Sequence, residues 1–174
     1  MLFRSWTISD NVFIGIRGRT GEARGAIFLW HDTRDCLVER NVIVDCDAGI
    51  CLGNAHKPAE IAVHCTGCTV RNNMLTRTPE NGILADYTRD CTIVHNTVHD
   101  PDSRLGRLVR LVHANDGLLL ANNLLSGPDV RRDFLTGELR ETGNLQRVLT
   151  DGFADPARGN LRLTARLPGI VGSV

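Results

Sequence analysis

Long apolar segments and an excess of charge of either sign are both absent from this sequence. No apolar run reaches the roughly 20 residues that a membrane-spanning helix needs, and the first residues, MLFRSWTISDN, lack a signal-peptide core and cleavage site. The 174 residues include 20 basic and 20 acidic side chains, which leaves no basic surface for nucleic acid. We therefore expect no membrane or nucleic-acid partner. We also expect a longer parent chain, secreted or periplasmic, that carries further N-terminal repeats.

Motifs that identify a reaction are missing as well. The sequence has no phosphate-binding loop, no Gly-x-Gly-x-x-Gly, no nucleophile elbow and no His-Glu-x-x-His. It also lacks a recognisable pair of carboxylates for glycoside hydrolysis. With 42% apolar residues the chain is long enough for one domain with a real core. Composition and motifs therefore indicate a folded domain without naming its reaction.

What the sequence does contain is an eight-residue pattern in five copies. The first and third positions are apolar or Cys, the sixth is Asn, and the eighth is Phe or aliphatic. The copies are WTISDNVF from Trp6, CLVERNVI from Cys36, CTVRNNML from Cys68, CTIVHNTV from Cys91 and LLLANNLL from Leu118. Their Asn residues are separated by 30, 32, 23 and 27 residues. A repeat of this size is typical of a solenoid.

The spacing of apolar residues within each copy predicts a strand, because it has a period of two. A second short strand lies in most intervals, often opened by Gly, as in GICLGN and GILADY. Too few residues remain for helical crossovers, so successive copies must pair in parallel around a common axis. The sequence therefore predicts an all-β parallel β-helix of about five to six rungs. Residues 1–127 would form the rungs, and 128–174 a last irregular rung and a C-terminal closing segment.

The repeat also assigns residues to columns that run along the solenoid. The Asn side chains should form a ladder in which each amide bonds those above and below. Three Cys residues share the first position, where Cys behaves as a small buried hydrophobe with a free thiol. The residues expected to point outward from the middle of each copy are Ser9, Glu39, Arg71, Val94 and Ala121. The first, third and eighth positions, beginning with Trp6, Ile8 and Phe13, should point inward.

These motifs resemble the right-handed parallel β-helix repeats of the pectate-lyase-like superfamily. The matching pieces are CTIVHNTV with NGILA and CLVERNVI with AGICL, and the resemblance covers about residues 5–127. It implies a right-handed coil and a role with polysaccharide. The Asn-Thr-Asp, Asp-Asp, Gly-His-Gly and Arg-Ile-Lys motifs of polygalacturonase-type hydrolases are absent, as is the Arg-x-Pro-x-x-Arg element of pectate lyases. No catalytic residue is therefore carried over by motif.

Polar residues gather just before the copies that begin at Cys36, Cys68, Cys91 and Leu118. Five and four positions upstream, the aligned rungs bring together His31, Asp32, His64, Asp86, Tyr87 and His113. His and Tyr are suited to proton transfer, and Asp to orienting a His or binding a cation such as Ca²⁺. This group is our candidate acid/base site, and no metal ligands are assigned. The alternative is a solvated corner between two strands.

Three further residues are candidates for substrate binding. Trp30 offers a face on which a sugar ring could stack, and Arg107 and Arg110 offer cations for an acidic polymer. The alternatives are simple packing for the Trp and solvation for the Arg residues. We thus expect a protein that binds or processes an acidic polysaccharide, as a lyase or epimerase ahead of a hydrolase. The alternative is a non-catalytic repeat module that forms homo-oligomers through its N-terminal rung.

Overall fold

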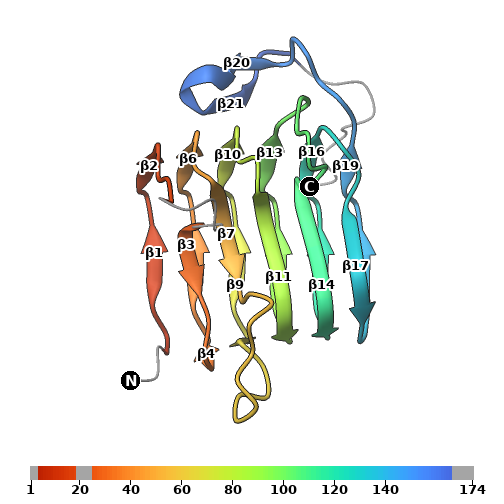
Figure 1. The fold of residues 1–174 in the computed structure, drawn as a ribbon. Coiled ribbons are helices and arrows are strands. Elements are labelled where there is room, and N and C mark those ends of the chain that lie inside the picture. Colours follow the sequence, from red (N-terminus) through yellow and green to blue (C-terminus); the bar gives the residue numbers. More distant parts are fainter. Residues whose placement is uncertain (1–3, 19–24, 166–174) are drawn as a thin grey trace.

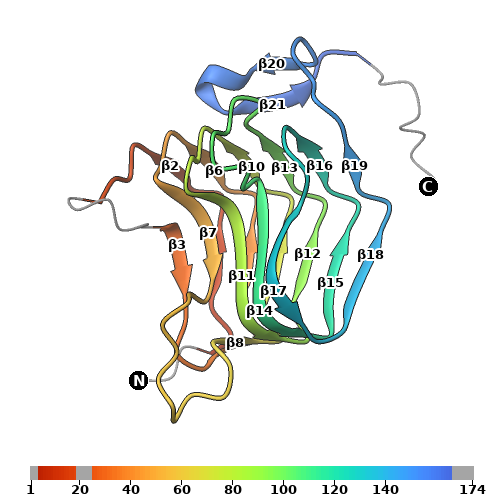
Figure 2. The same cartoon turned by 45° about the vertical axis from the view of Figure 1, so that its right-hand side comes forward.

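The structure, a computed structural model, describes residues 4–18 and 25–165 of the chain. It confirms the predicted right-handed parallel β-helix, in which strands of successive rungs lie side by side along the axis (Figure 1). Each rung contributes to three sheets that enclose the core (Figure 2). No helix within the described residues is long and apolar enough to cross a membrane.

The first two sheets are each built from one half of the repeat. The first sheet contains, in spatial order, β1 (Thr7–Ser9), β5 (Leu37–Glu39), β9 (Thr69–Arg71), β12 (Thr92–Val94), β15 (Leu118–Ala121) and β18 (Leu139–Thr142). The second contains β2 (Val12–Ile14), β6 (Val42–Val44), β10 (Met74–Thr76), β13 (Thr97–His99), β16 (Leu124–Ser126) and β19 (Leu145–Gln146). The sequence predicted at least two strands per rung, and the structure has three because each copy bends at its Asn.

The third sheet holds the intervening strands. Its order is β3 (Gly25–Leu29), β7 (Ala48–Leu52), β11 (Asn81–Arg89), β14 (Val109–Asp116) and β17 (Arg131–Thr136), and short strands β4 (Thr33–Arg34) and β8 (Cys65–Thr66) pair beside β11. Residues 53–64 form a loop between β7 and β8 that extends away from the rungs (Figure 1). This loop becomes one wall of the site described below.

The Asn ladder forms as predicted and has one more member than the sequence showed. In each step the backbone N–H and the side-chain amide of one Asn both donate to the side-chain oxygen of the next, at 2.9 to 3.1 Å. The members are Asn11, Asn41, Asn73, Asn96, Asn123 and Asn144. The repeat pattern does not include Asn144, because Glu141 and Gln146 replace the apolar residues at the third and eighth positions of its rung.

The residue before each ladder Asn has a left-handed backbone, which turns the chain from the first sheet into the second. The φ angles lie between 53° and 58° for Asp10, Arg40, Asn72, His95 and Asn122. Short polar residues such as Asn and Asp tolerate this conformation best. The corner is thus set by one strained residue and one hydrogen-bonded residue in succession.

Most of the predicted interior columns are buried, including Val38, Val70 and Ile93 at 0% exposure. All six Cys residues are buried free thiols. Trp6 was expected inside but is 55% exposed, because β1 has a strand neighbour on only one side within the described residues. Glu39 was expected on the surface but is only 6% exposed, since Arg40 and Arg71 cover its carboxylate, with Arg71 Nε 2.8 Å away.

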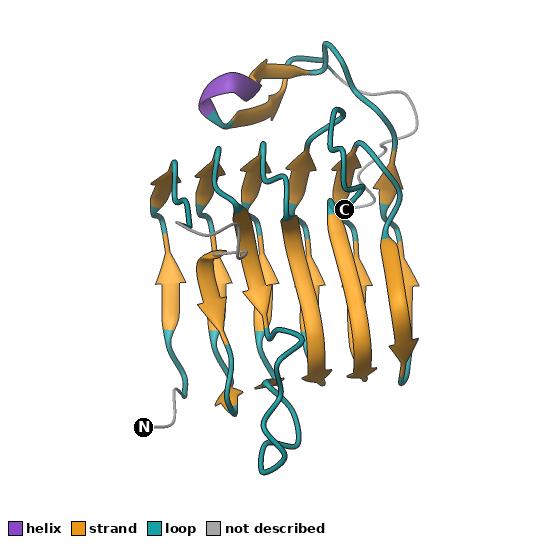
Figure 3. Ribbon diagram, in the orientation of Figure 1, coloured by secondary structure: helices purple, strands orange, loops and turns teal. Residues whose placement is uncertain are grey.

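The C-terminal part beyond the sixth rung folds back along the side of the solenoid. β20 (Phe153–Asp155), the short 3₁₀ helix η1 (Pro156–Arg158) and β21 (Asn160–Leu163) form a hairpin that lies across the ends of the second-sheet strands (Figure 3). Its apolar side packs against Met74 and Leu124. The sequence predicted a segment that closes the C-terminal end; the described part lies along the side instead, and residues 166–174 of that segment lie outside the described residues.

We expect Asn96→Ala to lower the free energy of unfolding by about 3 kcal/mol, because it removes a buried amide that serves three rungs. Its Nδ2 donates to Val70 O, Val94 O and Asn123 Oδ1, and its Oδ1 accepts from Asn73. Urea unfolding followed by circular dichroism measures the change. The control is Asn72→Gly, which removes an exposed amide and keeps the left-handed backbone, and it should cost about 0.5 kcal/mol or less. Equal losses in both variants would contradict the ladder's role.

Candidate functional site

Rings form a column at the corner where the chain leaves the third sheet, with stacked contacts except for an edge-on contact between His64 and Tyr87. Neighbouring ring centroids in this column are 4.7 to 6.2 Å apart. Four of the five residues have φ between 53° and 55°, His64 being the exception. The column contains His31, His64, Tyr87, His113 and Phe134. A shared left-handed turn therefore points one ring per rung in the same direction.

The register of this column differs from the predicted one by a single residue in two rungs. The sequence placed Asp86 in the column of His31 and His113, with Tyr87 in the next column. In the structure the strand pairing shifts between Asp86 and Thr88, so that Tyr87 stacks on His113 at 4.7 Å. Asp86 instead pairs with Val112 in the sheet. The shift could not be read from the sequence because turn lengths vary between rungs.

Asp86 and His113 are in direct contact across two rungs. His113 Nδ1 lies 2.9 Å from Asp86 Oδ1, and the side chains are 31% and 2% exposed. Burial raises the pKa of Asp86, and the bond to His113 opposes this without cancelling it. The pair therefore combines a buried carboxylate with an imidazole that still reaches solvent, which is the arrangement of an oriented general base.

This pair opens into a groove of about 260 Å³ on the outer face of the third sheet. The floor is apolar, the loop after β7 forms one wall, and charged residues surround the rest. The groove is lined by Asn54, Ala55, Glu80, Asn81, Leu84, Asp86, Arg107, Arg110, Val112, His113 and Phe134. Asn81 and Asp86 are five residues apart on β11, so the groove is about 16 Å long in the strand direction.

The two Arg residues of the groove differ in how well they are neutralised. Arg110 Nε lies 2.7 Å from Asp133 Oδ2, a close ion pair. Arg107 has a longer ion pair, with 3.7 Å between its Nη1 and Glu80 Oε2. Its buried Nε has no hydrogen-bond partner. Burial lowers the pKa of Arg107, and the nearby cations Arg110 and Arg131 add to the effect. Arg107 is thus a cation that an anionic ligand would stabilise.

Asn81 supplies an acceptor at the same end of the groove. It is 3% exposed, and its side-chain oxygen is buried without a hydrogen-bond partner. A buried polar atom of this kind is usually satisfied by water or by a ligand. Together with Arg107, Asn81 offers one acceptor and one cation, a set that suits a hydroxyl next to a carboxylate.

Other predicted site residues lie outside the groove lining. Asp32 pairs with Arg34, with its Oδ1 2.8 Å from Nη2. His64 is fully buried, and its Nε2 lies 3.0 Å from the carbonyl oxygen of Asn54, so it anchors the loop. Burial lowers the pKa of His64. Trp30 stacks on His31 with centroids 4.0 Å apart, and Trp30 is 37% exposed. The structure thus brings together Asp86, His113, Arg107 and Arg110, with Tyr87 stacked beside them.

Seven groove residues were not among the sequence-based candidates, and four of them, Asn54, Glu80, Asn81 and Phe134, have polar or aromatic side chains. Asn81 precedes Gly82 at the start of the second repeated strand, a place interpreted as scaffold. Phe134 lies in the irregular segment after Gly127, where no repeat pattern assigns a column. The one sequence feature that could have indicated Asn81 was its polar side chain at the first position of the strand that continues with Gly82.

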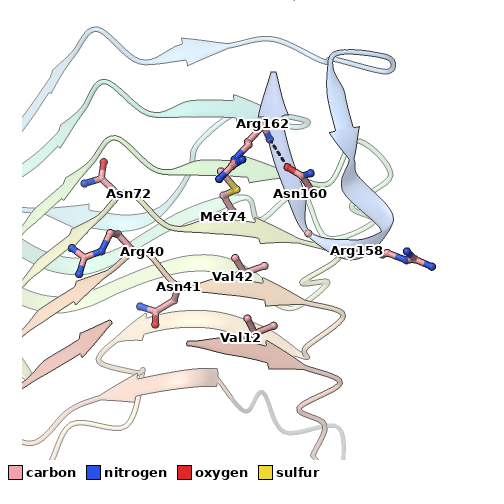
Figure 4. Close-up of a pocket in the computed structure, with 10 residues that line it drawn as sticks. Val12, Arg40, Asn41, Val42, Asn72, Met74, Arg158, Asn160 and Arg162 are labelled. Atoms are coloured by element: carbon pink, nitrogen blue, oxygen red, sulfur yellow. Dashed lines mark hydrogen bonds between the residues drawn. The ribbon is translucent and has the colours of Figure 1, made fainter. Parts of the chain in front are cut away.

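A second, larger groove of about 550 Å³ lies between the hairpin and the second sheet. Figure 4 shows Val12, Val42 and Met74 near one another beneath Arg162, with Arg158 directed away from them. Arg40, on its edge, is already bound by both oxygens of Asp10 at 2.8 Å. Its lining includes neither a His–carboxylate pair nor a buried polar atom without a partner, so the smaller groove is the stronger candidate for a functional site.

Residues 4–128 match the family model described as "Periplasmic copper-binding protein (NosD)". The chain belongs to this family. The match covers more than half of the chain and includes five of the six rungs, and this family shares the β-helix fold. No curated protein and no solved structure matches the chain.

The described residues do not fit a copper ion. Thiolates and imidazoles are the ligands that copper prefers, yet among residues 4–18 and 25–165 no three His, Cys, Asp or Glu side chains are placed to hold a metal. All six Cys residues are buried: five belong to the core inside the coil, and Cys51 packs with Leu84 and Val112 in a separate cluster, where burial raises its pKa to about 12. The lack of three suitably placed side chains among these described residues applies equally to Ca²⁺, the cation that the sequence suggested. The chemistry of the groove is therefore derived from its own side chains.

Asp86→Asn should make the folded protein more stable at pH 7. Because burial raises the pKa of Asp86 above the unfolded value of about 3.9, the ionised carboxylate disfavours folding, and this penalty grows as the pH rises through the raised pKa. The gain should shrink as the pH falls to about 4. Urea unfolding at a series of pH values measures it.

Asp133→Asn is a matched control of opposite sign. The Arg110 guanidinium holds the pKa of Asp133 below its usual range, so its ionised carboxylate stabilises the fold above about pH 4. That contribution is lost as the pH falls through the lowered pKa. This variant should therefore be less stable at pH 7. If Asp86→Asn is less stable than the wild type at pH 7, burial does not outweigh the bond to His113 in its effect on the pKa of Asp86.

Proposed function

We propose that the groove on the third sheet binds an acidic sugar of a polysaccharide and that His113 transfers a proton beside its carboxylate, as in a lyase or epimerase. The observation that carries the proposal is the poorly neutralised, desolvated Arg107 in the same groove as the Asp86–His113 pair. A cation that needs an anion and an oriented base are the two groups that such a reaction requires. The periplasm named in the family description is a compartment in which such a polymer is accessible.

His113 is the base in this proposal. When Asp86 is ionised, its oxygen accepts the Nδ1 hydrogen of His113, which leaves the lone pair of Nε2 free. The Nε2 removes the proton next to the uronate carboxylate, and the electron pair of that C–H bond moves into the carboxylate. The guanidinium groups stabilise the negative charge that develops there. Because His113 is partly exposed, a sugar in the groove reaches its ring.

The two reactions differ in the fate of the proton. In a lyase, the glycosidic C–O bond at the neighbouring carbon breaks, a C=C bond forms, and the proton on His113 passes to the leaving oxygen. In an epimerase, no bond to oxygen breaks and a proton returns to the opposite face of the same carbon. Tyr87, stacked on His113 at 4.7 Å, is the neighbouring hydroxyl group that could supply it.

Two variants should separate binding from proton transfer. Arg107→Gln is expected to weaken the binding of oligogalacturonate at least about tenfold, because a charge-assisted bond is lost. His113→Gln should lower turnover about 100-fold with little change in binding. Calorimetry measures the affinity, the ultraviolet absorbance of the unsaturated product reports a lyase, and deuterium incorporation from solvent reports an epimerase.

Arg158→Gln is the control for these variants, since Arg158 is 88% exposed and lines the other groove. It should bind oligogalacturonate as the wild type does. If Arg107→Gln and Arg158→Gln have the same effect, charge in general and not the groove governs binding. If both Arg107→Gln and His113→Gln leave affinity and turnover unchanged, the proposal fails.

As a second candidate, we infer a structural module that associates through its first rung. Val12 and Ile14 are 65% and 66% exposed on β2, an apolar pair at one end of the solenoid. Within the described residues β1 and β2 have a strand neighbour on one side only. In the ladder Asn11 donates to Asn41 and Asn144 accepts from Asn123, so within the described residues the Asn11 oxygen accepts no ladder bond and the Asn144 amide donates none. A second copy could thus continue the same ladder.

Ile14→Glu should convert such an assembly to a monomer, because it places a charge at the apolar end. Light scattering gives the molar mass over a range of concentrations. Val148→Glu, at a residue that is 54% exposed outside that end, is the control and should keep the wild-type mass. A wild type that is monomeric at every concentration would remove this candidate.

A further inference from the structure

Phe134 is an exposed aromatic residue in a strained backbone conformation. It is 84% exposed, more than any other large apolar side chain in the described part of the chain. Its φ of 55° lies in the left-handed region, which a bulky residue rarely adopts. The same left-handed turn recurs at His31, Tyr87 and His113, so the repeated corner of the coil imposes this backbone. At Phe134 this turn displays a phenyl ring to solvent.

The position of this ring is at the edge of the proposed site. Phe134 lines the same groove as Asp86 and His113. One side of its ring is stacked on His113, with centroids 6.2 Å apart and planes inclined by 14°. β17 is the last strand of the third sheet, so within the described residues no further rung adds a ring to the column. The other face of the ring is therefore open to a ligand.

The surroundings of Phe134 favour a sugar over a protein surface. Charged side chains occupy the same strand, where Arg131 pairs with Asp133 at 3.0 Å and Arg132 pairs with Glu141. A protein interface core is usually depleted of charge. A single aromatic face among polar groups suits the C–H face of a pyranose ring whose hydroxyls bond the charged neighbours.

We propose that Phe134 forms a subsite on which the sugar ring next to the reacting one stacks. This inference rests on the proposed function, because it places the reacting sugar at His113. A saccharide chain then lies across the groove from Asn81 and Arg107, past His113, to Phe134. The protein would recognise at least two linked sugars, and Phe134 would determine preference for length and not for charge.

The test uses Phe134→Asn and Phe134→Trp. Asn tolerates the left-handed backbone, so the first variant should fold with an unfolding midpoint equal to or above that of the wild type. Its affinity for trigalacturonate should fall about three- to tenfold, the size expected for one stacking contact. Its affinity for galacturonic acid should stay unchanged. Phe134→Trp should retain the affinity for trigalacturonate. Nuclear magnetic resonance titration measures both ligands.

The outcomes distinguish this subsite from the proposed function. Arg107→Gln should weaken both ligands, whereas Phe134→Asn should weaken only the longer one. If Phe134→Asn binds trigalacturonate as tightly as the wild type while Arg107→Gln does not, the subsite is wrong and the proposed function stands. If the wild type binds neither ligand, both are overturned.

Discussion

The structure depends above all on the hydrogen bonds of the Asn ladder. Five of the six ladder Asn residues use their backbone N–H and side-chain amide to hold the next rung, so the separation and register of the rungs are set at one corner. Interior columns such as Val38, Val70 and Ile93 line up because that corner repeats. The intervals between ladder members vary from 21 to 32 residues, and the third sheet and its loops absorb the difference.

Two corners of the coil contain the same left-handed turn, but the side chains displayed at the two corners differ. At the ladder corner the side chains, such as Arg40 and His95, point to solvent and form surface ion pairs or none. At the corner after the third sheet, rings occupy the equivalent position and stack along the axis. The stack holds His113 in place, and Asp86 then fixes its orientation from the adjoining strand. A repeated backbone feature thereby supplies the rigidity that a reactive group needs.

The fold was predictable because its pattern is local and recurs five times, and the match to the family model agrees with it. The candidate site was predictable only in part. Asp86 and His113 were selected by counting back from the repeat, and Arg107 and Arg110 by their charge. Asp32, selected by the same counting, and Trp30, selected as an aromatic face for a sugar, lie outside the groove lining. Counting along the chain cannot reveal a one-residue shift in strand pairing, which depends on how each turn packs.

The sequence by itself determined that this chain coils into a parallel β-helix with an internal Asn ladder, because apolar periodicity and a repeated amide leave few other ways to bury the core. Only the tertiary structure decided which polar residues meet. The loop of residues 53–64 walls the groove, burial sets the pKa of Asp86, and the last rung presents Phe134. These features arise between rungs that are more than 20 residues apart, where contact and desolvation depend on the packed coil and not on local pattern.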